Sequence, residues 1–314
     1  MRMRQFEYRG KHYTVPEFAG AGYRLTPRSE PQDLDLPTDS PILQRLGTTW
    51  DLENFKTPRR PVQLGIVPEE ERARIAGPGM PRTLDLPIKF PGSDFRVPQE
   101  FAQLRWLIQR VADLEAAINP RCYDEYYCYM TVDQGTVRAG SLQREAPCHV
   151  DGFQGARWDP PVRINHTFTV SDVLPTAYYV QPFDLDALDV ARHNAFWEMN
   201  RQVAATRSAH EWHAAPWELT LMDAYTVHRG AEAEVDTPRV WVRLSFEVRI
   251  FDRLGNAHNP LFRYDWEMVP RDIEGLGLVA LDPDSDPSLR VFPWQDVDGS
   301  PLPRTRRTKP RLRP

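Results

Sequence analysis

The chain has 314 residues, of which 41% are hydrophobic and 26% charged, and its net charge is −5. It contains no apolar run near the length of about 18 residues that a membrane span requires, and its 30 prolines argue against a helical bundle, because proline lacks the N–H that a helix interior needs. We therefore expect a mainly β protein, in one domain over residues 1–300, without a membrane partner.

The first 97 residues are interrupted by proline and glycine every few positions, so this region is expected to be a loop-rich wrap. Within it, Pro68 followed by three glutamates and closed by Gly77 predicts a short helix, because proline suits the first helical position and acidic side chains suit the first turn. Between Pro98 and Pro120, apolar residues recur at steps of three and four, which predicts an amphipathic helix.

From about residue 124 the pattern becomes that of β-strands, with a second helix among them. The expected strands are residues 126–132, 136–142, 162–170, 176–180, 217–222 and 239–251, with a turn at 133–135 and a helix within 186–206. We expect residues 124–252 to form the core of the domain, after an N-terminal wrap and helix over 1–120, and residues 253–300 to be a C-terminal extension.

The last expected strand has the most informative pattern. Valine, leucine, phenylalanine and isoleucine alternate with polar side chains from Arg239 to Ile250, which predicts one face in the core and one polar face. The polar face carries Arg239, Trp241 and Arg243, a combination that suits the wall of an anion-binding pocket better than simple solvation.

Two histidines and one carboxylate form the candidate centre. His149 and Asp151 are separated by one residue, so in an extended segment both side chains point the same way, and His228 follows 77 residues after Asp151. Neutral imidazoles and one carboxylate are the ligands of a facial Fe(II) site, which leaves coordination positions open. A His-x-Asp pair alone is weak evidence, because such pairs arise often by chance.

A candidate pair of carboxylate-binding residues strengthens this interpretation. Arg243 lies 15 residues after His228, and Ser245 is its neighbour on the same strand face. The planar guanidinium binds a carboxylate through two hydrogen bonds, and a serine hydroxyl two residues along the strand can reach the same group. The pair could therefore hold the distal carboxylate of a five-carbon diacid whose keto acid end is at the metal.

Together, His149-x-Asp151, His228 and Arg243-Leu244-Ser245 resemble the motifs of the Fe(II)/2-oxoglutarate-dependent dioxygenases, over about residues 124–252. The resemblance implies a double-stranded β-helix, which is a cupin-like jelly roll, with flanking helices. It also implies that His149, Asp151 and His228 bind Fe(II), that 2-oxoglutarate and O₂ are co-substrates, and that a substrate is hydroxylated with release of succinate and CO₂.

The resemblance also adds two candidate co-substrate residues. Some branches of the family place the 2-oxoglutarate arginine about 11 residues after the distal histidine, so Arg239 is a second candidate beside Arg243. Thr176 lies 25 residues after Asp151, where the taurine-type branch has a threonine that contacts 2-oxoglutarate.

The expected substrate is a small molecule, and an amino-acid-derived one is among the classes that suit the charges near the site. Gln154 and Arg157 follow Asp151 and either face the substrate or anchor their loop. Two other functions use the same residues: a zinc hydrolase in which these ligands activate water, and a non-catalytic jelly-roll binding protein. The pattern does not indicate an oligomeric state.

The cysteines and the C-terminal charges complete the expectations. Cys122, Cys128 and Cys148 have no metal-binding spacing, and no signal-peptide pattern precedes them, so we expect packed thiols in a cytoplasmic protein. Residues 301–314 carry six positive side chains, which leaves −11 for the first 300 residues. We expect this tail to be disordered, without nucleic acid as a partner, because it lacks interleaved aromatic residues.

Overall fold

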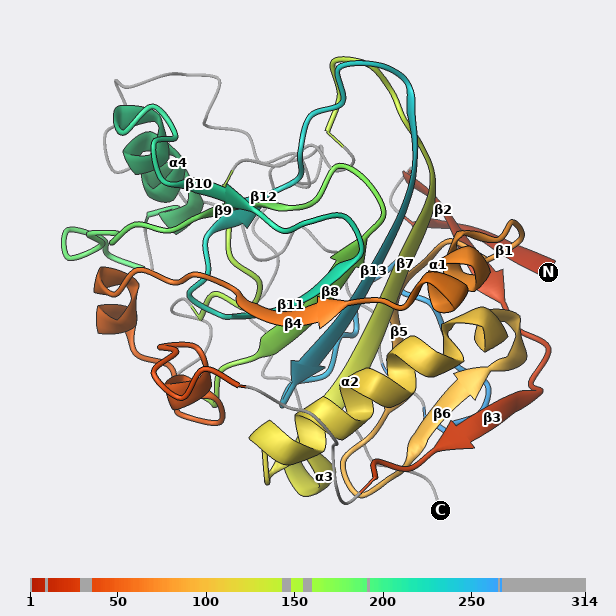
Figure 1. Cartoon of the computed structure of the whole chain (residues 1–314). Coiled ribbons are helices and arrows are strands. Elements are labelled where there is room, and N and C mark those ends of the chain that lie inside the picture. Colours follow the sequence, from red (N-terminus) through yellow and green to blue (C-terminus); the bar gives the residue numbers. More distant parts are fainter. Residues whose placement is uncertain are drawn as a thin grey trace.

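Antiparallel β-strands make up most of the regular structure in the computed structural model (Figure 1). The structure describes residues 2–8, 11–28, 36–142, 148–154, 160–190, 193–264 and 266. The strands are β1 (Arg2–Tyr8), β2 (Lys11–Glu17), β3 (Gly22–Leu25), β4 (Val62–Ile66), β5 (Thr83–Lys89), β6 (Phe95–Pro98), β7 (Tyr127–Val137), β8 (His166–Ser171), β9 (Ala177–Tyr179), β10 (Glu211–His213), β11 (Glu218–Asp223), β12 (His228–Arg229) and β13 (Thr237–Glu247). The helices are α1 (Glu69–Ala76), α2 (Arg105–Ile118), α3 (Cys122–Glu125) and α4 (Ala195–Ala205), with 3₁₀ turns η1 (Leu43–Arg45), η2 (Leu52–Lys56) and η3 (Gln99–Leu104).

Two sheets form the centre of the fold. The larger sheet has six strands in the order β4-β11-β8-β13-β7-β5, and the smaller sheet has the order β10-β9-β12. A bridge between His149 and His228 adds the segment around His149 beside β12. From β7 onward the chain passes repeatedly from one sheet to the other, with β7, β8, β11 and β13 in the larger sheet and the His149 segment, β9, β10 and β12 in the smaller one. Strands that alternate in this way between two antiparallel sheets have the topology of a jelly roll. The expected fold class is therefore confirmed.

Strand β13 separates the core from the polar interior. Val240, Val242, Leu244 and Phe246 all belong to the main hydrophobic core, which also contains Leu107, Ile108, Val111 and Leu114 of α2. Helix α2 therefore covers one face of the larger sheet, as its apolar periodicity predicts. The residues of β13 between them, among them Arg239, Trp241 and Arg243, lie on the opposite face of the sheet.

A second hydrophobic cluster supports the smaller sheet. Ala177 and Tyr179 of β9 pack there with Ala195, Met199 and Val203 of α4, and with Trp50 and Phe55 from the N-terminal region. Trp50 stacks on Tyr225 with ring centroids 4.9 Å apart, so the loop before β12 is held by the N-terminal wrap. The segment that carries His228 is consequently packed against this cluster.

Most of the expected elements are present, with three differences. The turn predicted at 133–135 and the separate strand predicted at 136–142 are wrong, because β7 continues through the turn to Val137 and pairs residue by residue with β13 from Glu247↔Tyr127 to Thr237↔Val137. The helix expected within 186–206 is shorter, since it begins after Asn194, whose side chain accepts a hydrogen bond from the N–H of Phe196. The N-terminal wrap is partly regular, with β1 and β2 forming a separate hairpin.

The cysteine prediction is confirmed, since Cys122, Cys128 and Cys148 are buried free thiols. Across the described ranges, no helix combines the length and the apolar composition needed to cross a bilayer. The expected basic tail, residues 301–314, lies outside the described residues.

Candidate metal centre

Three side chains converge between the two sheets. His149, Asp151 and His228 each offer one ligand atom, and these atoms lie within 4.8 Å of one another. In the described part of the chain, no other group of three or more His, Cys, Asp or Glu side chains meets as a candidate metal site. The structure therefore brings together the three residues whose types and spacing predict a facial metal site.

Backbone pairing places the two histidines. The N–H of His149 donates to the carbonyl of His228, and the N–H of His228 donates to the carbonyl of His149, each at 2.9 Å. Their rings lie side by side with centroids 4.6 Å apart. Asp151 follows two residues after His149, at the point where the segment turns, so its carboxylate reaches the same space.

A hydrogen bond determines which ring nitrogen of His228 carries a proton. Nδ1 lies 2.9 Å from the carbonyl oxygen of Thr226, and because a carbonyl only accepts, Nδ1 carries the proton. The neutral ring can therefore bind a metal through Nε2. Thr226 is held in turn by Asp223 Oδ1, which accepts from the Thr226 hydroxyl at 2.9 Å and from the N–H of Tyr225 at 3.0 Å.

A glycine permits the turn after Asp151. Gly152 has φ +80°, a left-handed conformation in which a side chain is disfavoured. A Cβ at this position would lie only 2.1 Å from Oδ1 of the buried Asn165. The conformation of the chain at Asp151 therefore depends on a position that only glycine fits.

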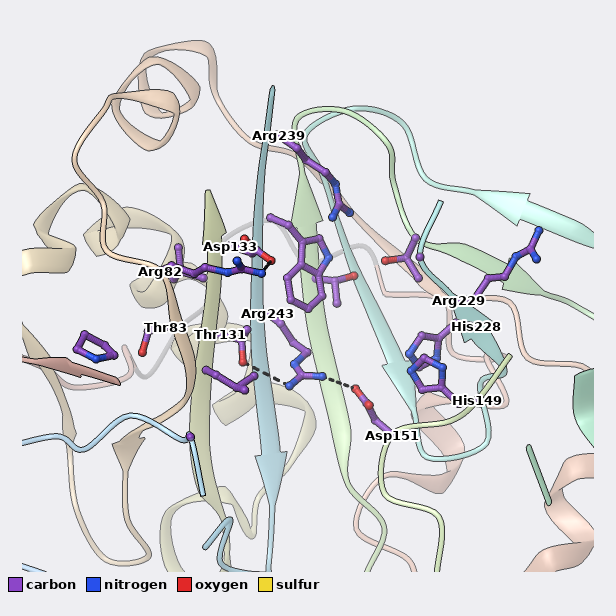
Figure 2. Close-up of a pocket in the computed structure, with 18 of the residues that line it drawn as sticks. Arg82, Thr83, Thr131, Asp133, His149, Asp151, His228, Arg229, Arg239 and Arg243 are labelled. Carbon is purple, nitrogen blue, oxygen red and sulfur yellow. Dashed lines mark hydrogen bonds and ion pairs between the residues drawn. The ribbon is translucent and has the colours of Figure 1, made fainter. Parts of the chain in front are cut away.

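These residues line a cavity of about 370 Å³ whose far wall is the polar face of β13 (Figure 2). Arg239, Trp241 and Arg243 all contribute to that wall. The guanidinium carbons of Arg239 and Arg243 lie 5.9 Å and 5.6 Å from the Trp241 ring centroid, so the indole separates the two cations. The polar face of this strand, for which the alternation predicts anion binding, therefore lines the same cavity as the His-Asp-His group.

Arg243 contacts the candidate metal ligand Asp151 directly. Its Nη1 donates to Asp151 Oδ2 at 3.0 Å and its Nη2 donates to Asp85 Oδ1 at 2.7 Å. Burial by itself lowers the pKa of Arg243, but the two carboxylates outweigh that effect and raise it. The guanidinium is thus already engaged by two carboxylates of the chain.

Arg239 is in a different electrostatic situation. It is 3% exposed, its Nε donates to the carbonyl of Val173 at 3.0 Å, and no described carboxylate lies within ion-pair distance of it. Burial lowers its pKa to about 10, and the more distant Asp133 and Asp172 only partly oppose this. A buried guanidinium without a contacting carboxylate favours binding of an anion from solution.

The other predicted site residues have different surroundings. Thr176 lines the cavity, in the turn before β9. Ser245 does not: it is buried, and its hydroxyl accepts a hydrogen bond from Thr167 at 3.2 Å. The side chain of Gln154 bonds the backbone of Val162 in both directions, which is the loop-anchoring role. Arg157 lies outside the described residues.

The cavity wall also contains residues that the sequence did not indicate. Arg82 and Asp133 form an ion pair at 2.9 Å beside it (Figure 2). Met3, Thr14 and Pro16 of the β1–β2 hairpin close one side, although this hairpin pairs with no other described strand. Asp85 supports Arg243 from β5. None of these belongs to a recognisable motif, because each reaches the cavity only through the tertiary fold.

Comparisons with known proteins give distant structural similarities. No protein-family model matches the chain, and no curated protein sequence does. AviO1 from Streptomyces viridochromogenes Tue57 is similar over 65% of this chain and 92% of its own, with 12% identity and a TM-score of 0.34. EvdO2 from Micromonospora carbonacea var. aurantiaca, solved in complex with 2-oxoglutarate, is similar over 64% and 92%, with 15% identity and a TM-score of 0.34.

A third solved structure is HygX from Streptomyces hygroscopicus, with nickel and 2-oxoglutarate bound. It is similar over 58% of this chain and 79% of its own, with 12% identity and a TM-score of 0.32. Because these TM-scores are below 0.5, the similarities do not establish a shared function. The chemistry of the site follows from its own geometry.

Substitution of Gly152 by alanine tests the turn that places Asp151. We expect Gly152→Ala to lower the free energy of unfolding by more than the roughly 1–2 kcal/mol that a left-handed alanine costs, because its Cβ also meets Asn165. Gly20→Ala is the matched control, since Gly20 has the same φ of +80° but no atom within 4 Å of the point that a Cβ would occupy. Urea denaturation of both variants gives the comparison, and equal losses would show that the contact with Asn165 is unimportant.

Proposed function

We propose that this protein is a non-haem Fe(II)/2-oxoglutarate-dependent oxygenase that hydroxylates a small molecule. The observation that carries the proposal is that one cavity contains both a His-Asp-His group and a buried arginine that no described carboxylate contacts. The first can bind a metal ion with coordination positions left open, and the second can bind the distal carboxylate of a diacid.

The donor set fits Fe(II). Two imidazoles and one carboxylate come from one side of the cavity, and His228 is held in the tautomer that presents Nε2. A carboxylate has two oxygens, so Asp151 can bind a metal ion while it accepts a hydrogen bond from Arg243. Fe(II) bound there would supply the activation of O₂ and of the keto acid.

Arg239, rather than Arg243, is proposed to bind the distal carboxylate of 2-oxoglutarate. Arg243 already contacts two carboxylates, one of them the metal-binding Asp151, so it marks the metal end of the cavity. Arg239 lies four residues away on the same face of β13, about 13 Å along the strand at the usual rise per residue. A five-carbon diacid with its keto acid end at the metal would extend toward Arg239.

Two threonine hydroxyl groups of the cavity suit a bound carboxylate. The Tyr178 hydroxyl lies 2.8 Å from Thr169 Oγ1 and 3.3 Å from Thr220 Oγ1, and both Thr169 and Thr176 line the cavity. Trp241 lies on the wall between the two arginines. The part of the cavity walled by Arg82, Asp133 and the β1–β2 hairpin is left for the substrate.

A zinc hydrolase built on the same three ligands is the alternative. His and carboxylate ligands also suit zinc, and an open position could hold water. Such an enzyme has no need of a second buried cation in the cavity, so Arg239 favours the oxygenase. Metal analysis of protein purified without added metal, together with 2-oxoglutarate-dependent succinate formation, separates the two functions.

The triad is tested by removing one imidazole. We expect His228→Ala to lose bound metal and succinate formation, because it deletes one of the three side chains that meet at the site. His213→Ala is the control, since His213 is an exposed histidine of β10 that bonds Glu211 and lies outside the triad. Metal content and succinate are measured for both variants, and full turnover by His228→Ala would refute the assignment.

The two arginines are separated by binding measurements. We expect Arg239→Leu to weaken 2-oxoglutarate binding to the cobalt-loaded protein by at least a hundredfold, since loss of a buried charge pair costs about 3–5 kcal/mol. Its cobalt affinity should stay near that of the wild type. Arg243→Leu should instead change the metal affinity, because its guanidinium contacts Asp151.

Calorimetric titration with 2-oxoglutarate, after separate titration with Co²⁺, gives both affinities for each variant. Arg239→Lys is a further control, since it keeps the positive charge but loses the planar fork, and we expect an intermediate loss. If Arg243→Leu proves the more damaging to 2-oxoglutarate binding at saturating cobalt, the co-substrate lies on Arg243.

A further inference from the structure

A buried carboxylate holds the far side of the guanidinium that contacts Asp151. Arg243 Nη2 donates to Asp85 Oδ1 at 2.7 Å, and Arg243 Nη1 donates to Asp151 Oδ2 at 3.0 Å. We propose that Asp85 is a positioning residue of the metal centre, which sets the orientation of Asp151 and its availability to a metal ion by sharing Arg243 with it. This inference rests on the metal site proposed above.

The backbone of Asp85 is held in a conformation that few residues adopt. Its φ is +44°, in the left-handed region, where asparagine and aspartate are the best tolerated residues after glycine. The Thr131 hydroxyl accepts from the N–H of Asp85 at 3.0 Å and lies 3.1 Å from its Oδ1. A disfavoured conformation that the surroundings fix so closely is typical of functional sites.

A bulge directs Asp85 toward the site. Thr83 pairs with Val132 of β7, but the next pair is Leu86 with Met130, so β5 contains one residue more than its partner here. In a regular ladder, Asp85 itself would lie opposite Met130, which belongs to the hydrophobic core. The extra residue instead places Asp85 beside Thr131, on the face that carries Arg243.

The charges explain what Asp85 contributes. One guanidinium lies between two carboxylates, so the three side chains together carry one negative charge. If Asp85 lost its charge, the whole attraction of Arg243 would act on Asp151 and would compete with a metal ion for that carboxylate. By pairing with Arg243 from the other side, Asp85 weakens the pull of the guanidinium on Asp151 and leaves that carboxylate oriented for a metal ion. Partners of metal ligands typically act in this way.

A purely structural role would have a different consequence. Arg243 is 7% exposed, and a buried arginine needs a carboxylate partner for the stability of the fold alone. In that case, removing the charge of Asp85 would destabilise the metal-free protein and leave the metal affinity of the folded protein unchanged. Metal affinity and stability therefore have to be measured separately.

The test is the variant Asp85→Asn, which keeps the shape of the side chain and tolerates the left-handed backbone. We expect it to bind Co²⁺ about 10- to 100-fold more weakly than the wild type, with an altered visible absorption spectrum of the bound cobalt. The metal-free full-length proteins are titrated with Co²⁺, and their thermal unfolding is followed by circular dichroism. Asp85→Gly is a second variant, which removes the carboxylate and also relaxes the backbone at φ +44°.

Asp133→Asn is the matched control. It removes one negative charge from the wall of the same cavity, but Asp133 pairs with Arg82 and does not touch Arg243. Weaker cobalt binding by both Asp85 variants, with wild-type affinity in Asp133→Asn, supports the proposal. Wild-type affinity in either folded Asp85 variant, or an equal loss in Asp133→Asn, overturns it.

The wild-type titration separates this inference from the metal site itself. If the wild type binds Co²⁺ and His228→Ala does not, the metal site stands, and only the Asp85 variants decide the role of Asp85. If the wild type binds no Co²⁺, the proposed metal site fails, and the role of Asp85 in it fails too.

Discussion

The two hydrogen bonds between the backbones of His149 and His228 are the constraint on which the site depends. Without them, the segment around His149 would be a loop, since this bridge is its one β contact in the described structure. The bridge ties His149 to β12, and β12 is tied to β9 through Tyr178 and Ala177. The relative position of the two imidazoles is therefore set by the sheet rather than by side-chain flexibility.

The opposite wall sets the charge of the cavity, through two buried arginines that are balanced differently. Removing a cation from water is costly unless an anion compensates for it. Arg243 is compensated by Asp85 and Asp151, whereas Arg239 has a carbonyl contact and more distant acids. One strand thus presents a cation paired with two carboxylates near the His-Asp-His group, and a cation without a contacting carboxylate farther along. A dianionic ligand can complete this distribution of charge at both ends.

Elements with a long local pattern were predictable from the sequence. The amphipathic helix before residue 120 and the alternation along β13 persist over many residues, so neighbouring contacts do not alter their period. The triad was predictable because residue type and spacing both restrict its geometry. The turn at 133–135 was not, because its local signals are outweighed by the continuous ladder with β13. The alternation along β13 correctly predicted that Ser245 lies on the polar face. It could not show that Ser245 lies outside the cavity, where it bonds Thr167 instead.

The contact between Asp85 and Arg243 could not be predicted from the sequence. Strands are read with a period of two, and a shift of one residue moves every following side chain to the other face. The bulge between Thr83 and Leu86 makes that shift once, so it brings Asp85 to Arg243 while Leu86 reaches the core beside Met130. Both outcomes depend on the same extra residue. A carboxylate beside Arg243 and an unbroken core on the other face of the sheet therefore require each other in this fold.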